Sequence, residues 1–204
     1  MFGGLLMMRF SKTEIQHLLR AWVLVSLAFA IAFSGFSLDA KFGIAVFVSA
    51  ITAGIGFVGH ELMHKYVAQK HHCWAEFRAN DFMLGLMVLF SFFGFIFAAP
   101  GGVFIRNHVT RRKHGVIALA GPLTNIVLGF AFAVLMLFLP SGLKPLGNYG
   151  MQINFFLGFF NMLPLPGIDG SRVWAWNRAV YVIVFVFSII LAFSSTTLIK
   201  ALFG

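Results

Sequence analysis

The sequence predicts an all-α multi-pass membrane protein, a bundle of about five to six transmembrane helices with a re-entrant or hairpin segment near residues 82–105. Of its 204 residues, 60% are hydrophobic and only 10% are charged, whereas soluble domains carry roughly 25% charged residues. The long apolar runs are of helical length and lack the alternation of a membrane β-barrel. We therefore expect one membrane-embedded domain over residues 1–204, with no soluble regulatory domain.

Six apolar runs are candidates for the helices. They cover about residues 21–38, 42–70, 82–99, 114–139, 149–166 and 179–203. The first run follows a basic N-terminus and could be read as a signal peptide, but its length and the runs that follow favour an uncleaved first span.

The third run, residues 82–99, is open to two interpretations. A simple spanning helix is the commoner structure for such a run. If it spans, however, the Lys and Arg residues divide almost evenly between the two sides, whereas a segment that returns collects most of them on the N-terminal side. The positive-inside rule therefore favours a re-entrant segment and a cytoplasmic N-terminus, and the glycines of this region and Pro100 suit a bent path.

The charge distribution argues against nucleic-acid binding, and the cysteine content excludes two kinds of structural feature. The formal net charge is +9, but the basic residues lie in short loops between apolar runs, as cytoplasmic loops do, so nucleic-acid binding is not expected. Cys73 is the single cysteine, which excludes an intrachain disulfide and a cysteine-based zinc site.

The pentapeptide His60-Glu61-Leu62-Met63-His64 ends the second run and predicts a metal site. Positions i and i+4 share a helix face, so both imidazoles can bind one ion while Glu61 reaches a water on that ion as general base. The pattern also occurs by chance, but ionisable residues at membrane depth are costly and usually functional.

A third ligand is needed, because catalytic zinc generally has three protein ligands and one open position. The neighbouring His71, His72, Glu76 and Asp81 read as residues of a solvated loop, Glu14 as part of the N-terminal arm, and Asp39 as a residue of the opposite membrane face. The acidic residue that is left is Asp169, in a stretch broken by Pro164 and Pro166. An ordinary Asp-Gly turn is the alternative.

The membrane topology bears on this choice of ligand. In the re-entrant topology Asp169 shares the cytoplasmic face with the histidines, whereas in the spanning topology about 30 Å of hydrocarbon separates them. The charge distribution and the metal geometry thus favour the same topology, in the cell membrane with the site toward the cytoplasm.

These residues resemble the site-2 protease family of intramembrane zinc metalloproteases, in its compact prokaryotic form. The resemblance covers about residues 42–178. It includes His60-Glu61-x-x-His64, Gly121-Pro122-Leu123-Thr124-Asn125, and the stretch from Asn161 to Gly170, which is similar to the family pattern N-x-x-P-x-P-x-x-D-G. Ser171 and Gly167 depart from residues frequent in the family.

The resemblance implies a chemistry and a substrate. One Zn²⁺ would be bound by His60, His64 and Asp169, with Glu61 as the base. Asn161, and more weakly Asn125, would bind the substrate backbone or the oxyanion, although hydrogen bonding between helices is their alternative role. The substrate would be a membrane-spanning helix that must unwind locally, and residues 100–105 could offer it an extended partner.

A protein of another class remains the competing interpretation. An intramembrane metal-binding protein or metal-ion transporter would use the same ligands, but a transport path should have ionisable groups through the whole membrane. Here the ionisable groups gather near one membrane face. A third alternative is a membrane scaffold without catalytic activity, and Glu61 argues against it because zinc binding alone would not require that residue.

Overall fold

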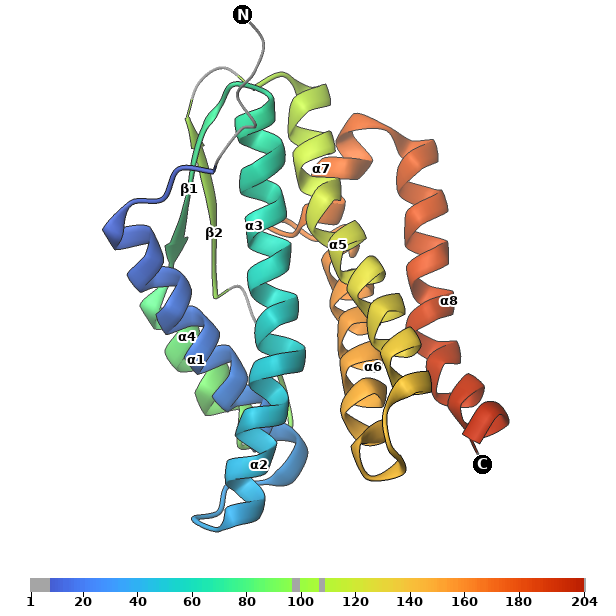
Figure 1. Ribbon diagram of the computed structural model, residues 1–204. Helices are drawn as coiled ribbons and strands as arrows, with labels where there is room; N and C mark the ends of the chain where they lie inside the picture. Colours follow the sequence, from blue (N-terminus) through green and yellow to red (C-terminus); the bar gives the residue numbers. More distant parts are fainter. Residues whose placement is uncertain (1–7, 97–99, 107–108, 204) are drawn as a thin grey trace, which may run out of the picture.

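The computed structural model describes residues 8–96, 100–106 and 109–203, with side chains described to residue 194 (Figure 1). Its elements in chain order are α1 (Lys12–Ser34), α2 (Ala40–Ser49), the π-helical segment η1 (Ala50–Gly54), α3 (Ile55–Lys70), β1 (Trp74–Ala79), α4 (Asp81–Ser91), β2 (Gly101–Arg106), α5 (Arg111–Phe138), the 3₁₀ turn η2 (Ser141–Leu143), α6 (Lys144–Asn161), α7 (Asp169–Trp176) and α8 (Arg178–Phe203).

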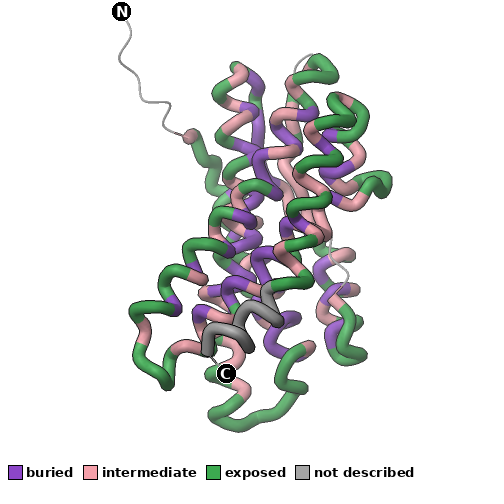
Figure 2. Tube along the Cα trace, turned by 90° about the vertical axis from the view of Figure 1, so that its right-hand side faces the viewer, coloured by how far each residue is buried: buried purple, intermediate pink, exposed green. Residues whose placement is uncertain are grey.

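The protein is mostly helical and belongs in a membrane, as the sequence predicts. Three helices within the described residues are long and apolar enough to cross a bilayer, namely Lys12–Ser34, the continuous helix Ala40–Lys70, and Arg111–Phe138. Shorter apolar helices are Asp81–Ser91 and the part of α8 up to Ser194. Buried and exposed residues alternate along the helices (Figure 2), so each helix has an inner face and an outer face.

The helices form two groups on either side of α3. On one side α1 packs against α4 and β1, and on the other α5 packs against α6 and α7, while α8 contacts α6 and α7 (Figure 1). Because α3 contacts α5 and also β1 and β2, its residues can face both groups. The metal-site pentapeptide lies on this central helix.

Helix starts follow capping residues that the hydropathy pattern alone does not reveal. The Ser11 side chain accepts from the Glu14 N–H and starts α1 at Lys12, well before the apolar run near residue 21. Asp39, Asn80 and Thr110 accept in the same way at the starts of α2, α4 and α5.

The chain between α3 and α5 contains a two-stranded sheet that the all-α prediction missed. β1 and β2 are antiparallel, with Trp74 opposite Arg106 and Ala79 opposite Gly101, so the chain leaves and returns at the same end of the bundle. Of the predicted third run, residues 82–91 are helical, as part of α4 (Asp81–Ser91), and residues 92–96 are not; Gly94 has φ +76° in the turn that follows α4. Residues 97–99 lie outside the described residues.

The outer edge of β1 is covered by α1. The Phe77 N–H donates to Glu14 Oε1 at 2.9 Å, and the Ala79 N–H donates to His17 Nδ1 at 3.0 Å. In an antiparallel ladder, two directly opposite residues either hydrogen bond to each other or both point their backbone groups outward. Because Phe77 and Ala79 donate outward to α1, their partners Val103 and Gly101 also point their backbone groups away from β1. Both residues line a cavity, so the free edge of the sheet faces that cavity.

A buried ion pair joins α1 to α3. Lys65, the residue after His64, pairs with Glu14, and both side chains are fully buried. The Lys65 ammonium also donates to the Arg9 carbonyl at 2.5 Å and lies 3.8 Å from the centroid of the Phe10 ring. Glu14 is therefore part of the core and not of a free N-terminal arm. Its burial is tolerated because the positive charge of Lys65 on α3 balances its negative charge.

Candidate metal centre

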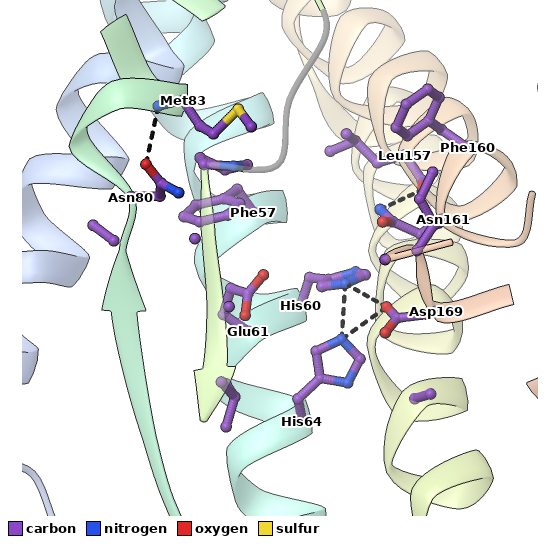
Figure 3. A pocket seen from close by; sticks show the side chains of 18 of the residues that line it. Phe57, His60, Glu61, His64, Asn80, Met83, Leu157, Phe160, Asn161 and Asp169 are labelled. Carbon is purple, nitrogen blue, oxygen red and sulfur yellow. Dashed lines mark hydrogen bonds and ion pairs between the residues drawn. The ribbon is translucent and has the colours of Figure 1, made fainter. Parts of the chain in front are cut away.

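The structure brings His60, His64 and Asp169 together, as the sequence predicts (Figure 3). Asp169 Oδ2 lies 3.2 Å from His60 Nε2 and 3.0 Å from His64 Nε2, and the two ring nitrogens are 2.9 Å apart. All three residues are buried. Ligands about 2.0–2.2 Å from one tetrahedral ion lie about 3.3 Å from each other, so the three atoms are placed to share an ion.

Both imidazoles are held through their other ring nitrogen. His64 Nδ1 donates to the Ile117 carbonyl at 2.7 Å, and His60 Nδ1 lies 2.7 Å from Asn125 Oδ1. A neutral imidazole with its proton on Nδ1 has its lone pair on Nε2. The contacts to α5 therefore direct a metal-binding lone pair of each ring toward Asp169, as outer partners do in known histidine metal sites.

Asp169 is placed by a turn that breaks the chain between α6 and α7. Gly167 has φ +88°, a left-handed conformation that favours glycine. A Cβ on Gly170 would lie 2.3 Å from the Met162 carbonyl oxygen, so α7 packs directly on the end of α6. Arg172 Nη1 lies 3.2 Å from Asp169 Oδ1, which leaves Oδ2 directed at the histidines.

Gly121 lets α5 come close to the two histidines. A Cβ at this position would lie 2.5 Å from His64 Nε2 and 2.6 Å from His60 Nε2, closer than real contacts allow. This glycine opens the motif Gly121-Pro122-Leu123-Thr124-Asn125. The motif thus supplies two parts of the site: Gly121 leaves space beside the ligands, and Asn125 supplies the oxygen that accepts a hydrogen bond from His60 Nδ1.

Glu61 lies beside the three ligands in a shared cavity of about 810 Å³. Its side chain is buried, and Oε2 has no hydrogen-bond partner among the residues that the structure describes. A buried carboxylate oxygen without a partner is costly, and a water or ion between Glu61 and the ligands would satisfy it. This orphaned oxygen and the His, His, Asp donor set both fit a zinc ion with an open coordination position.

The two predicted asparagines lie in different places. Asn161 lines the cavity, with its Nδ2 donating to the Leu157 carbonyl at 3.0 Å. Asn125 is fully buried, and its Nδ2 donates to the Gly56 carbonyl and to Asn154 Oδ1. Substrate or oxyanion binding by either residue stays a prediction, and for Asn125 these hydrogen bonds leave no free amide hydrogen.

The other acidic and histidine residues near the pentapeptide do not join the triad. His71 and His72 follow the end of α3, as expected for a loop. Glu76 and Asp81, however, lie in β1 and at the start of α4 and not in a loop, and they pair with Arg78 and Arg20.

Two contributors to the site were missed by the sequence reading, Asn154 and Arg172. A signal existed for Asn154, since an amide in an apolar run is costly unless it has partners. None existed for Arg172, which reads as an ordinary basic residue of a loop.

Fold and site together define a class: a membrane protein with a buried His, His, Asp metal centre and an adjacent carboxylate, the arrangement of metal-dependent hydrolases. No family model matches the sequence, and no solved structure gives a significant match.

Three curated relatives sharpen this class. The chain is 42% identical to the "Putative zinc metalloprotease MJ0611" of Methanocaldococcus jannaschii, over 86% of this chain and 91% of the relative. It is 32% identical to the "Putative zinc metalloprotease YwhC" of Bacillus subtilis, over 60% of this chain and 65% of that protein. It is 38% identical to the "Putative zinc metalloprotease Rip2" of Mycolicibacterium smegmatis, over 43% of this chain and 36% of that protein.

The chain belongs to this site-2 protease-like family of zinc metalloproteases. The family and the triad together fit one Zn²⁺ as the cofactor.

Proposed function

We propose that this protein is an intramembrane zinc metalloprotease that hydrolyses peptide bonds within or near transmembrane helices of other membrane proteins. One observation carries the proposal. His60, His64, Asp169 and Glu61, whose Oε2 has no hydrogen-bond partner in the described part of the chain, meet in a single cavity inside a bundle with helices apolar enough to cross a bilayer. A water-requiring site within such helices suits a substrate that itself lies in the membrane.

Each residue has a role in the proposed reaction. His60, His64 and Asp169 would hold the zinc, which when bound lowers the pKa of a coordinated water to about 7 and polarises a carbonyl. Glu61 would accept the proton of the attacking water and pass it to the leaving amine. Arg172 would keep Asp169 oriented through its 3.2 Å contact to Oδ1. Asn161, on the cavity wall, would bind the substrate backbone.

The free edge of β2 would bind the unwound substrate. Gly101, Val103 and Ile105 lie opposite β1 in the non-hydrogen-bonded pairs of the ladder, so their backbone N–H and C=O groups point away from β1, and all three residues line the cavity that holds the metal ligands. An extended peptide can add to such an edge through backbone hydrogen bonds. A substrate helix that unwinds would thereby regain hydrogen bonds beside Glu61, which offsets part of the cost of unwinding.

The same reasoning extends to the placement of the chain. We propose a multi-pass protein of the cell membrane with about five to six spanning helices, the segment from β1 to β2 re-entering the bilayer, and the site toward the cytoplasm. Residues 1–204 would form one domain whose partners are the lipid bilayer and the substrate helix, without nucleic acid. The return of the chain at Trp74 and Arg106 supports the re-entrant path.

The test combines metal content with cleavage. Purified protein is expected to bind about one zinc per chain and to cleave some members of a panel of membrane-spanning substrates in detergent or vesicles. His60→Ala and Asp169→Ala should lose zinc, whereas Glu61→Gln should keep zinc and lose cleavage. Asp39→Asn removes an exposed carboxylate that does not line the cavity and keeps an N-cap for α2, so it serves as the control that keeps both.

Two results would overturn the proposal. One is wild-type protein that binds zinc and cleaves nothing in the panel, which would favour the metal-binding or transport alternative. The other is a Glu61→Gln variant as active as the wild type.

A further inference from the structure

Asn154 is a fully buried amide on α6 that neither the motifs nor the proposed reaction uses. Its Nδ2 donates to the Gly150 carbonyl at 2.9 Å and, at a longer 3.5 Å, to the Thr52 carbonyl of η1. Its Oδ1 accepts from Asn125 Nδ2 at 3.1 Å. The side chain therefore joins α6 and η1 to α5, beside the metal ligands.

The hydrogen-bond directions in this cluster follow from one another. Backbone carbonyls can only accept, so the NH₂ of Asn154 must face Gly150 and its Oδ1 must face Asn125. Asn125 consequently turns its own NH₂ toward Asn154, where the same group also reaches the Gly56 carbonyl at 3.0 Å. The oxygen of Asn125 is thereby left as the atom that faces His60.

The last step reaches the metal site. Asn125 Oδ1 is an acceptor 2.7 Å from His60 Nδ1, so His60 carries a proton on Nδ1, and the neutral ring that can bind a metal has its lone pair on Nε2, the nitrogen that faces Asp169 and His64. We propose that Asn154 is a positioning residue which, through Asn125, fixes the tautomer and ring orientation of His60 for zinc binding. This inference rests on the zinc site of the proposed function.

The packing around Asn154 allows its side-chain amide only one orientation. A Cβ on Gly56 would lie 2.4 Å from Asn154 Oδ1, so α3 presents a glycine where the amide oxygen passes. Reversing the amide would place its NH₂ against Asn125 Nδ2 and its oxygen against the Gly150 carbonyl, two unfavourable contacts. One orientation of each amide is therefore consistent with all of its neighbours.

The first measurement needs no variant. In full-length protein labelled with ¹⁵N-histidine and freed of metal, the ¹⁵N shifts of the His60 ring report which nitrogen is protonated, with His60→Ala supplying the assignment. The proposal expects the Nδ1–H form in the wild type. A wild-type ring with a proton on Nε2 and none on Nδ1 would overturn it.

Variants then distinguish the effect of the Asn154 hydrogen bonds from the effect of its side-chain volume. Asn154→Leu keeps the approximate volume but removes the acceptor, so we expect mixed His60 tautomers and zinc affinity lowered by about 10–100-fold in competition with a chelator. Asn154→Asp, neutral when buried, keeps one donor and one acceptor and is expected to bind zinc within a few-fold of the wild type. Gln152→Leu, which removes an amide paired with Asn148 on the same helix, is the matched control and should change neither readout.

Equal tautomer and equal affinity in Asn154→Leu would overturn the positioning role, as would an equal loss in Gln152→Leu. Both readouts are obtained without substrate, so they do not depend on proteolysis. Protein with the expected tautomer and zinc affinity but without cleavage would contradict only the proposed function. Protein that cleaves membrane helices while Asn154→Leu behaves as the wild type would contradict only this inference.

Discussion

The two sides of α3 are held together in different ways. On the side of α5, α6 and α7, polar side chains are buried, and most hydrogen bond to specific atoms of a neighbouring helix, as Asn125 does to His60 and to the Gly56 carbonyl. On the side of β1, α4 and β2, the contacts are a two-stranded ladder, apolar packing and the side chains of α1. On the first side, hydrogen bonds hold individual side-chain atoms in place. The second side offers a strand edge whose outward backbone groups have no hydrogen-bond partner among the residues that the structure describes.

This difference separates two requirements of the proposed reaction. Metal ligands must keep their geometry in every turnover, whereas a surface that binds many sequences should recognise the backbone that they share. Changes on the first side should therefore act on zinc, and changes on the second should act on cleavage.

The largest effect is expected at Gly121. A methyl group there would overlap both ligating nitrogens, so Gly121→Ala should lower zinc affinity by at least 100-fold and abolish cleavage. Gly85→Ala, on α4, adds a Cβ with no described atom within 4 Å and should leave zinc binding unchanged. Chelator competition on both variants checks this, and an intact site in Gly121→Ala would contradict the described packing.

The next effect concerns the ion pair between the two sides. Lys65→Met leaves Glu14 charged and buried, which typically destabilises a protein by about 3–5 kcal/mol. Adding Glu14→Gln removes the second charge and keeps an acceptor for the Phe77 N–H, so the double variant should regain most of the lost stability. Thermal unfolding in detergent measures both, and a double variant less stable than Lys65→Met would refute the pairing.

A smaller effect, confined to cleavage, is expected in β2. Val103→Pro removes an N–H that points away from β1, so it should lower the cleavage rate by about tenfold or more while zinc content stays at the wild-type value. Phe104→Pro removes a ladder hydrogen bond instead and should lower thermal stability as well. Unchanged cleavage by Val103→Pro would count against substrate binding at this edge.

The smallest effect is a pH dependence on the second side. The Ser11 hydroxyl donates to Glu76 and the Arg78 guanidinium lies 2.9 Å away, which together outweigh burial and hold the pKa of Glu76 below its usual range. A carboxyl with a lowered folded-state pKa adds stability above its unfolded pKa and loses it as the pH falls through the folded value. The difference in unfolding temperature between wild type and Glu76→Gln should therefore shrink on acidification below about pH 4; a constant difference would contradict this assignment.

Sequence reasoning located the metal site better than its surroundings. His60 and His64 follow from helical spacing, and Asp169 from the scarcity of acidic residues in an apolar chain. The sheet was missed because the segment 74–79 is short and mixed in character, and because strand pairing depends on partners 22–32 residues away in the sequence. The prediction that Glu14 lies in an N-terminal arm was wrong. A single charged residue near a terminus gives no sign in the sequence that it will form a buried ion pair with Lys65.

The π-helical segment η1 has a consequence for how the site tolerates changes in chain length. A π turn closes its hydrogen bond over one residue more than an α turn, so residues 50–54 hold one residue that a regular helix would not need. A one-residue deletion here would restore α-helical hydrogen bonding and rotate α2 about the helix axis. His60 and His64 would still face Asp169. The cost would fall on the Trp22 indole, which donates to the Ala50 carbonyl at 3.1 Å, and on the longer contact of Asn154 with Thr52. Length variation among relatives should therefore be better tolerated before Gly54 than between His60 and Lys70.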